Sequence, residues 1–269
     1  MAEQVLHGPR DHERPTRRYG PVGVVAALSD VHGNVPALAA VLAEPDVASA
    51  DLVVICGDLT WGPEPQQTYE LIAALGARAL CVRGNADRYA SEIGAGTRVT
   101  GRPREAWIPA RHSPDAMAFL QALPFSVVVE VGSLGPVLFC HGSPRSDHEL
   151  VTPGTPGERF AALTATVQAR TLVTGHAHLQ FDRTVADRRS VGPGSVGLPF
   201  HRGAPGTAHW ALLGPDGVRL RTSRYDADEA VARTRASGDP AAETIVTLLT
   251  SPPTPEEIIA DAESRVFSD

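Results

Sequence analysis

The sequence predicts an α/β protein whose sheet is largely parallel in its N-terminal half. Short apolar runs rich in valine alternate there with stretches of helical periodicity, which is the pattern of βαβ units. Polar residues with glycine follow directly after several of these runs, as at the carboxyl ends of buried strands. Hydrophobic residues make up 42% of the 269 residues and charged residues 20%, so a packed core is expected.

The N-terminal half supplies three strands and the two helices between them. The run at 22–28 is continuous and apolar, as expected of a strand that is buried on both faces. Asn34 is a good N-cap for the first helix, with Pro36 in its first turn, and Gly76 ends the second helix. These elements are expected at 22–28, 34–43, 52–56, 66–75 and 79–82.

The rest of the chain is expected to hold hairpins and helices. Residues 91–113 carry several glycines and prolines and are expected to leave the core as a lid. Ser113 or Asp115 is expected to cap a helix that runs to Leu123. Gly-Ser-Leu-Gly at 132–135 and Gly-Pro-Asp-Gly at 214–217 each predict a hairpin. Strands are expected at 126–131, 136–140, 171–174, within 181–191, 208–213 and 218–223, and helices at 158–169, 226–236, 240–250 and from 254.

We expect three segments along the chain. Residues 1–20 are polar, lack the apolar stretch of a signal peptide and predict a disordered leader. Residues 21–225 are expected to form one domain, and residues 226–269 an acidic helical extension that packs on it. The extension carries no chemical motif and is a candidate interface for a homo-oligomer.

The composition excludes several classes of function. A net charge of −7 argues against nucleic-acid binding by charge, and no apolar run reaches the ~20 residues that a membrane span needs. All 24 basic residues are arginine, which excludes Schiff-base chemistry on lysine and a Walker phosphate loop. A phosphate group would be held by metal, arginine, histidine or backbone N–H groups.

The cysteines indicate a reducing compartment. Cys56, Cys81 and Cys140 lie in or at the end of apolar runs, and an odd number in such places predicts buried thiols rather than disulfides. They have no Cys-x-x-Cys spacing, which disfavours a thiolate metal site. We therefore expect a cytoplasmic protein.

Residues with metal-binding side chains follow five of the predicted strands. They are Asp30 and His32, Asp58, Asn85, His141, and His176 and His178. In an open α/β sheet, ligands bind beyond the carboxyl ends of the strands, so these side chains are expected at one rim. Residues two apart, as in Asp30-Val-His32, lie on the same side of an extended backbone, so each such pair is expected to converge on one centre.

The types of these residues favour divalent transition metals. Carboxylate, imidazole and amide groups suit Mn, Fe, Zn or Ni, and do not suit Ca or a thiolate site. Seven ligands are too many for one tetrahedral ion but fit two divalent metal ions that share a carboxylate. Mn is the metal that we expect to support activity in vitro.

The ordered motifs Asp-x-His, Gly-Asp, Gly-Asn-x-Asp, His-Gly and Gly-His-x-His resemble those of the calcineurin-like metallophosphoesterase superfamily over about residues 24–200. His141-Gly-Ser-Pro and Gly192-Pro-Gly-Ser-Val-Gly resemble the small bacterial and archaeal branch that includes the YfcE-like phosphodiesterases. The resemblance implies a four-layer α/β/β/α sandwich with metals between the sheet ends.

The resemblance also implies a role for each residue. One metal would be held by Asp30, His32 and His178, the second by Asn85, His141 and His176, with Asp58 as the bridge. It implies a small phosphorylated substrate, a metabolite or nucleotide, whose phosphomonoester or phosphodiester is hydrolysed by a metal-bridging hydroxide. Asp58, Asn85 and His141 would act through that hydroxide.

One position departs from the superfamily pattern. Much of the superfamily has a histidine directly after the Gly-Asn asparagine, whereas this chain has Ala86 followed by Asp87. General acid catalysis is worth ~10²–10⁴-fold in rate. We therefore expect either leaving groups that need little protonation or an acid from elsewhere, with His112 and His148 as the candidates.

Three residues beside the motifs are predicted to contact the substrate: Asn34, Arg83 and Arg145. Arginine can hold a phosphate group bidentately. An ordinary salt bridge is the alternative for both arginines, and the helix cap is the alternative for Asn34.

Two other functions stay open. A non-catalytic scaffold can keep a fold after losing its site, as in the retromer subunit that resembles this branch, but all seven ligands are present here. A protein Ser/Thr phosphatase typically continues its Gly-Asp motif with Asp-Arg-Gly. Here Leu-Thr-Trp-Gly follows Gly57-Asp58, which disfavours that class.

Overall fold

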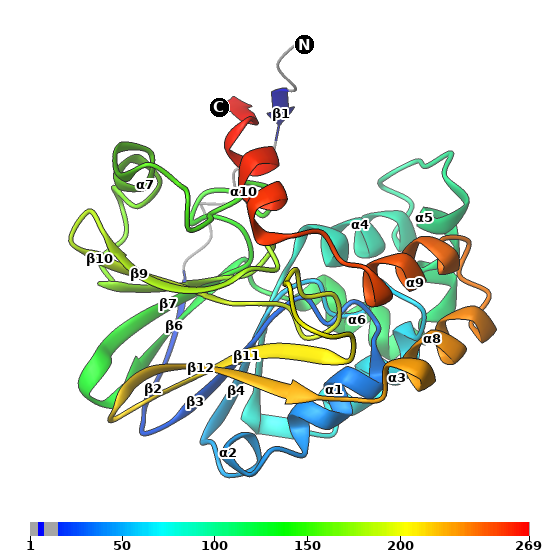
Figure 1. The fold of residues 1–269 in the computed structure, drawn as a ribbon, viewed down its shortest axis with the longest axis horizontal. Coiled ribbons are helices and arrows are strands. Elements are labelled where there is room, and N and C mark those ends of the chain that lie inside the picture. The colour runs from blue at the N-terminus through cyan, green and yellow to red at the C-terminus, as the bar shows by residue number, and fades with distance from the viewer. Residues whose placement is uncertain (1–4, 8–15, 269) are drawn as a thin grey trace.

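The structure, a computed structural model, describes residues 5–7 and 16–268, and consists of two facing β-sheets with helices on their outer sides (Figure 1). The five-stranded sheet has the order β12 (Gly217–Arg224), β11 (Thr207–Gly214), β3 (Val25–Leu28), β4 (Leu52–Cys56) and β5 (Ala79–Val82). The six-stranded sheet has the order β2 (Arg17–Val22), β6 (Ser126–Val131), β7 (Gly135–Cys140), β8 (Thr171–Thr174), β10 (Arg188–Pro193) and β9 (Gln180–Val185). A separate parallel pair joins β1 (Val5–His7) to β13 (Val266–Ser268).

Most helices lie between or after the strands of the first half. They are α1 (Val35–Leu42), α2 (Pro45–Ala48), α3 (Pro65–Ala73), α4 (Asn85–Gly94), α5 (Pro103–Trp107) and α6 (Pro114–Ala122), followed by α7 (Gly157–Leu163). Three short 3₁₀ turns are η1 (Gly76–Arg78), η2 (Pro109–Arg111) and η3 (Gly132–Leu134). The C-terminal helices are α8 (Ala227–Ala236), α9 (Ala242–Thr250) and α10 (Pro255–Glu263).

Alternating side chains of the strands build the layers. On β3, Ala26 and Leu28 pack with helix residues such as Leu38 of α1, because successive strand residues point to opposite faces. Val25 of the same strand packs between the sheets with residues such as Phe139 of β7. The far face of the six-stranded sheet is covered by α7 and α10. The four-layer α/β/β/α sandwich implied by the sequence is confirmed.

Parallel pairing places the strand ends together. β3, β4 and β5 are mutually parallel, and so are β7 and β8. The two predicted hairpins form as β6–β7 and β11–β12. Asn34 caps α1 and Ser113 caps α6, as predicted, by accepting from the N–H groups of Ala37 and Ala116. The carboxyl ends of five strands from both sheets therefore meet at one edge.

The predicted strand at 22–28 is wrong in one respect, because the chain changes sheet within it. Val22 ends β2 in the six-stranded sheet, and Val25 begins β3 in the other. The Asp51 carboxylate accepts from the N–H groups of Gly23 and Val24, both at 2.8 Å, and holds this crossing. A continuous apolar run does not reveal such a change, since both sheets bury their strands.

Two other boundaries differ from prediction. Residues 17–20 of the predicted leader belong to β2, which pairs with β6, while residues 1–4 and 8–15 of that leader lie outside the described part of the chain. The helix predicted at 158–169 ends at Leu163, where Thr164 turns its hydroxyl back to the carbonyl of Phe160.

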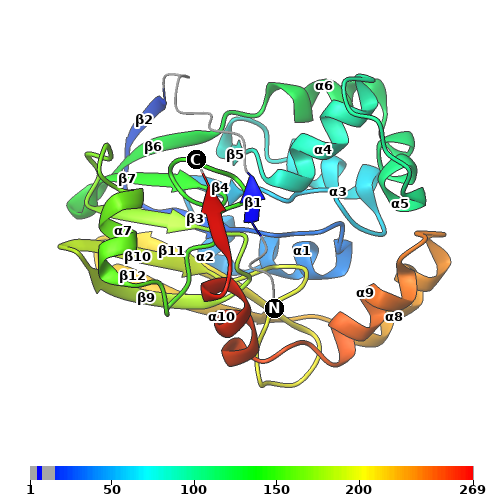
Figure 2. The same cartoon turned by 90° about the horizontal axis from the view of Figure 1, so that it is seen from above.

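The predicted C-terminal extension is helical and packs on the sandwich. Figure 2 shows α8 and α9 beside α1, with α10 returning toward the six-stranded sheet. Ile245 and Leu249 of α9 form a small apolar cluster with Ala230 of α8. In the part of the chain that the structure describes, no helix has the length and apolar character to cross a bilayer.

Candidate metal centre

The structure brings the seven predicted ligands together where the two sheets meet. Asp30 and His32 follow β3, Asp58 follows β4, Asn85 begins α4 after β5, His141 follows β7, and His176 and His178 follow β8. Six of these residues form two groups of three, and within each group the candidate ligand atoms lie within 4.8 Å of one another. The first group is Asp30, His32 and His178, and the second is Asp58, His141 and His176. We call these group 1 and group 2.

Group 1 is compact and largely buried. Nε2 of His32 lies 3.1 Å from Nε2 of His178, which is 3.3 Å from Oδ1 of Asp30. Asp30 has no exposed surface and His178 only 9%. The buried Asp30 carboxylate also accepts from the N–H of His176, at 3.0 and 3.2 Å, and so joins the two groups.

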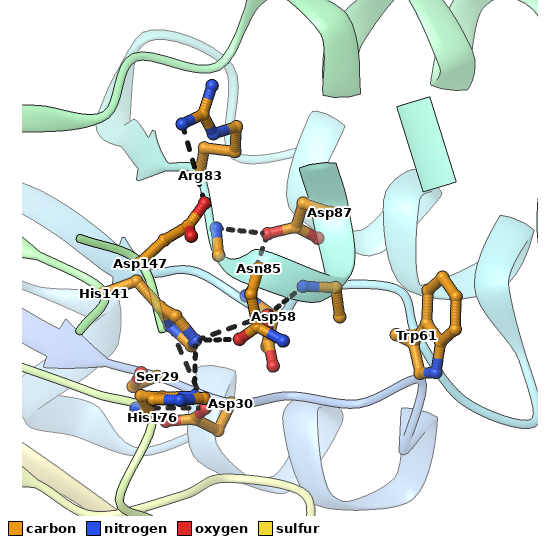
Figure 3. Close-up of polar contacts among 12 residues, drawn as sticks. Ser29, Asp30, Asp58, Trp61, Arg83, Asn85, Asp87, His141, Asp147 and His176 are labelled. Carbon is orange, nitrogen blue, oxygen red and sulfur yellow. Dashed lines mark hydrogen bonds and ion pairs between the residues drawn. The ribbon is translucent and has the colours of Figure 1, made fainter. Parts of the chain in front are cut away.

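Group 2 gathers around His141 (Figure 3). Its Nε2 lies 3.1 Å from Nδ1 of His176 and 3.0 Å from Oδ1 of Asn85. Figure 3 shows His141 between Asp58 and Asn85 on one side and His176 with Asp30 on the other. The imidazole of His141 is 1% exposed, so water does not screen these contacts.

Asp58 is a member of group 2 that also faces group 1. Its Oδ1 is 3.4 Å from Nε2 of His141, and its Oδ2 is 3.6 Å from Nε2 of His32. Oδ1 also accepts from the N–H of Ala86 at 2.9 Å, which fixes the orientation of the carboxylate. Each oxygen therefore faces a different group, as a bridging ligand requires.

The backbone at the site is left-handed at five of the seven ligands. Asp30, His32, Asp58, His176 and His178 have φ between 48° and 64°. Among the described non-glycine residues, only Ala186 and Asp187 share this conformation. Such residues are uncommon and concentrate at functional sites. The convergence of Asp30 with His32 thus comes from left-handed turns, and the extended backbone predicted for these pairs is wrong.

Backbone carbonyl groups fix the tautomer of the four histidines among the predicted ligands. Nδ1 of His32, His141 and His178 lies 3.2, 2.7 and 2.7 Å from the carbonyl oxygens of Trp61, Cys56 and Leu198. Nε2 of His176 lies 3.1 Å from the carbonyl of His148. A carbonyl only accepts, so each of these nitrogens carries the proton. The other ring nitrogen then presents a lone pair to the centre, which is the usual arrangement of metal-binding histidine.

The facing nitrogens need a cation between them. In each group two imidazole lone pairs meet at 3.1 Å, with carboxylate oxygens nearby, and neither nitrogen can donate to the other while both rings are neutral. Ligands about 2.1 Å from one ion stand about 3.0–3.4 Å apart in octahedral or tetrahedral geometry. The donor set and its spacing fit one divalent ion in each group.

Protons occupy these positions when no metal is bound. Burial lowers the pKa of His141 and His178, but nearby carboxylates outweigh it, Asp58 first for His141 and Asp30 for His178, so both pKa values lie above the usual range. Burial and the positive charge of the facing histidine lower the pKa of His32 to about 4. The same two causes lower the pKa of His176 well below its usual value. One proton per pair is the expected state of the metal-free protein.

We expect Mn²⁺ affinity to rise with pH through the neutral range. A metal must displace the protons of His141 and His178, and the carboxylates that raise their pKa values keep those protons bound to a higher pH than in an ordinary histidine. Titration calorimetry in buffers of different ionisation enthalpy should show release of about one proton per metal near pH 6 and less at pH 8. Affinity and proton release that do not change with pH would contradict this assignment.

Asp87 is a buried residue whose role the sequence did not reveal. Its carboxylate accepts from the N–H groups of Asp58, Leu59 and Gly84 at 2.8 to 2.9 Å, and so ties the β4 loop to the start of α4. Gly84 permits this approach, since a Cβ there would lie 2.1 Å from Oδ1 of Asp58. The signal was the acidic residue in the first turn of a helix, which often accepts backbone N–H groups.

Asn34 is not brought to the ligands. Its Oδ1 accepts from the N–H of Ala37, and its amide nitrogen donates to the carbonyl of Gly197 and to the hydroxyl of Tyr225. The side chain is buried and serves as a helix cap and as a tie to neighbouring segments. The helix cap is confirmed, and the substrate contact stays a prediction.

The two predicted arginines form ion pairs with buried acids of the loop after β7. Arg145 binds Glu149 with two bonds of 2.8 and 2.7 Å. Arg83 approaches Asp147 at 3.5 Å, and Arg88 binds the same carboxylate from α4. Figure 3 shows Arg83 on the far side of Asp147 from the ligands. Salt bridges, the alternative for these arginines, are what the structure contains.

The two candidate acids differ in position. His112 is engaged at both nitrogens, by the carbonyl of Ile108 and the hydroxyl of Thr60, each at 2.9 Å. Burial lowers its pKa, so it is neutral at pH 7 and Nε2 accepts from Thr60. His148 lies closer, with its ring centroid 6.4 Å from that of His176 and its Nε2 against the Tyr89 hydroxyl. The structure thus favours His148 over His112 as a neighbour of the ligands.

Comparison with known proteins gives a family and a fold. Residues 24–213 match the model of the calcineurin-like phosphoesterase superfamily domain. A metallophosphoesterase from Sphaerobacter thermophilus is 23% identical, with 85% of this chain and 98% of that one covered and a TM-score of 0.69. A hypothetical protein from Pyrococcus horikoshii is 21% identical, with coverage of 86% and 99% and a TM-score of 0.72. No curated protein matches the sequence.

Proposed function

The chain belongs to the calcineurin-like phosphoesterase superfamily, and we propose that it is a dinuclear metal-dependent phosphoesterase acting on a phosphomonoester or phosphodiester of a small metabolite or nucleotide. The observation that carries the proposal is the pair of facing histidines in each of two adjacent groups. The lone pairs of each group converge on one place where a divalent ion would fit, and Asp58 directs one oxygen toward the histidines of each group.

Asp30, His32 and His178 would hold one divalent ion, and Asn85, His141 and His176 would hold the other, with Asp58 shared. Bound there, the ions would supply Lewis-acid charge for the phosphate oxygens and would lower the pKa of water so that it becomes a nucleophile at neutral pH. The ring protons held by backbone carbonyls keep each imidazole in the ligating tautomer. Mn is the metal we propose for assays.

The chain's own residues suggest a preference among leaving groups. Ala86 stands where a histidine would reach the leaving group, and this residue is buried. Its N–H instead orients Asp58. The two candidate acids are both engaged, His112 by the carbonyl of Ile108 and the hydroxyl of Thr60, and His148 by the hydroxyl of Tyr89. We therefore propose that the enzyme favours leaving groups of low pKa, which depart without protonation.

The metal requirement is a direct test. After chelation the protein should hydrolyse neither p-nitrophenyl phosphate nor bis-p-nitrophenyl phosphate, and added Mn²⁺ should restore turnover of at least one of them. Rates for a series of aryl phosphates should fall steeply as the pKa of the leaving phenol rises. A folded protein that binds Mn²⁺ and turns over neither substrate would instead favour a non-catalytic scaffold.

The cysteines support a reducing location for this activity. Cys56, Cys81 and Cys140 are buried and free, and burial raises the pKa of each thiol. We propose the cytoplasm on this basis.

A further inference from the structure

The histidines of the two groups are held by different parts of the fold. In group 2, the carbonyl partners belong to Cys56, the last residue of β4, and to His148, in the loop after β7. In group 1, the carbonyl partners belong to Trp61 and Leu198. Group 2 therefore has one partner in a strand, whereas both partners of group 1 lie in loops, so the position of group 1 depends more on what packs against its loops.

The loop after β10 forms a cradle for His178. The carbonyl of Leu198 accepts the Nδ1 proton at 2.7 Å. The ring of Phe200 stacks on the imidazole with centroids 4.8 Å apart and planes 13° from parallel, and the N–H of Phe200 donates to the carbonyl of His178. The conformation of this loop therefore sets both the tilt and the depth of the imidazole.

The C-terminal helical hairpin, α8 with α9, covers the same loop. Leu198 packs against Ala230, Ile245 and Leu249. These side chains enclose, together with His32, a cavity of only about 10 Å³. A cavity of that size barely holds one water molecule, so the hairpin is in close contact with the supports of group 1.

Two ion pairs tie the hairpin to the loops around the site. Nε of Arg233 lies 3.0 and 3.1 Å from the two carboxylate oxygens of Glu64, which belongs to the segment that carries Trp61. Nε of Arg104 lies 3.0 and 3.1 Å from the oxygens of the buried Asp239, between α5 and the turn of the hairpin. The segment that holds His32 is thus also attached to the hairpin.

We propose that the α8–α9 hairpin positions His178 and His32, and thereby sets the metal affinity of group 1 while leaving group 2 unaffected. The inference rests on the proposed metal binding. Residues that orient a metal-binding histidine typically change metal affinity by ~10–100-fold when substituted. The C-terminal extension is therefore a positioning element of one metal site, in addition to a packing element.

Substitution at the hairpin contact tests the proposal by metal binding alone. The metal-free full-length protein is titrated with Mn²⁺, and free Mn²⁺ is measured by its electron paramagnetic resonance signal. The wild type should bind two ions. Leu249→Ala should keep one ion at wild-type affinity and weaken the other about 10-fold or more. Leu213→Ala removes a fully buried leucine of β11 that pairs with Val25, at the end of β3 away from Asp30, and should bind both ions as the wild type does.

A double-substitution cycle assigns the weakened ion to a group. In a His176→Ala background, which leaves group 1 intact, Leu249→Ala should weaken the bound ion about 10-fold. In a His178→Ala background, which leaves group 2 intact, Leu249→Ala should leave the affinity of the bound ion unchanged. If Leu249→Ala does not fold, Arg233→Gln is a second variant, because it removes an ion pair and leaves the apolar contact in place. It should also weaken the ion in group 1.

Equal weakening of both ions, or unchanged affinity at group 1 in folded Leu249→Ala and Arg233→Gln proteins, would overturn the inference. These results are separate from a failure of the proposed activity. A wild type that binds two ions, shows the selective loss and yet hydrolyses no phosphate ester would refute catalysis and leave the positioning role intact.

Discussion

Asp58→Asn is expected to lower kcat with Mn²⁺ by at least about 10²-fold, because several kcal/mol of electrostatic stabilisation depend on both ions and each 1.4 kcal/mol is tenfold in rate. The side chain offers one oxygen to each group, at 3.4 Å from His141 and 3.6 Å from His32. Neutralising the carboxylate removes charge from both centres at once. Steady-state turnover of an activated phosphate ester measures the loss.

The geometry also predicts which ion is lost first. The N–H of Ala86 donates to Oδ1 of Asp58, so the oxygen of an asparagine amide would take that place and face group 2. The amide NH₂ would then point toward Nε2 of His32 and oppose a cation in group 1. Metal analysis should therefore show a larger loss from group 1 than from group 2.

Asn85→Ala is the matched control for this variant. Its amide oxygen lies 3.0 Å from Nε2 of His141, within group 2. We expect it to weaken one ion only and to lower total metal content less than Asp58→Asn. Equal metal stoichiometry in the two variants would show that Asp58 does not bridge.

The positions of the metal-binding residues were predictable from two features. Their residue types are those of metal ligands, and each one lies at the carboxyl end of a strand, where parallel sheets bring such residues together. His141 and His176 come from the six-stranded sheet and Asp58 from the five-stranded one, yet each lies just beyond the carboxyl end of a buried strand. Strand direction alone places such residues at one edge. The assignment of the strands to two sheets instead of one came from the family resemblance, because buried strands of both sheets have the same apolar sequence pattern.

The details that escaped prediction depend on tertiary contacts. Asn34 and Arg145 lie close to motifs in sequence, but their polar atoms are satisfied by a helix N-terminus and by Glu149. The left-handed φ of Asp30 and Asp58 is likewise invisible in residue type, because aspartate also occurs in ordinary turns. Proximity to a motif in the sequence therefore does not reveal which partner a polar side chain takes in the fold.

Asp87→Ala is expected to destabilise the metal-free protein by at least about 3 kcal/mol, because it leaves three buried backbone N–H groups without an acceptor and each costs about 1–3 kcal/mol. Urea unfolding followed by circular dichroism measures the change in the free energy of unfolding. Two of these N–H groups belong to Asp58 and Leu59, so metal affinity should fall as well.

Asp87→Asn separates hydrogen bonding from side-chain size. Oδ2 accepts from Asp58 and Gly84 and Oδ1 only from Leu59, so an asparagine can keep its oxygen at the first two and turn its NH₂ toward the third. Asp87→Asn should lower the free energy of unfolding by about 1–3 kcal/mol, the penalty of one unsatisfied N–H. Its stability should therefore lie between that of the wild type and that of Asp87→Ala. Equal destabilisation by both substitutions would mean that the negative charge of Asp87, and not its count of accepted hydrogen bonds, holds the β4 loop in place.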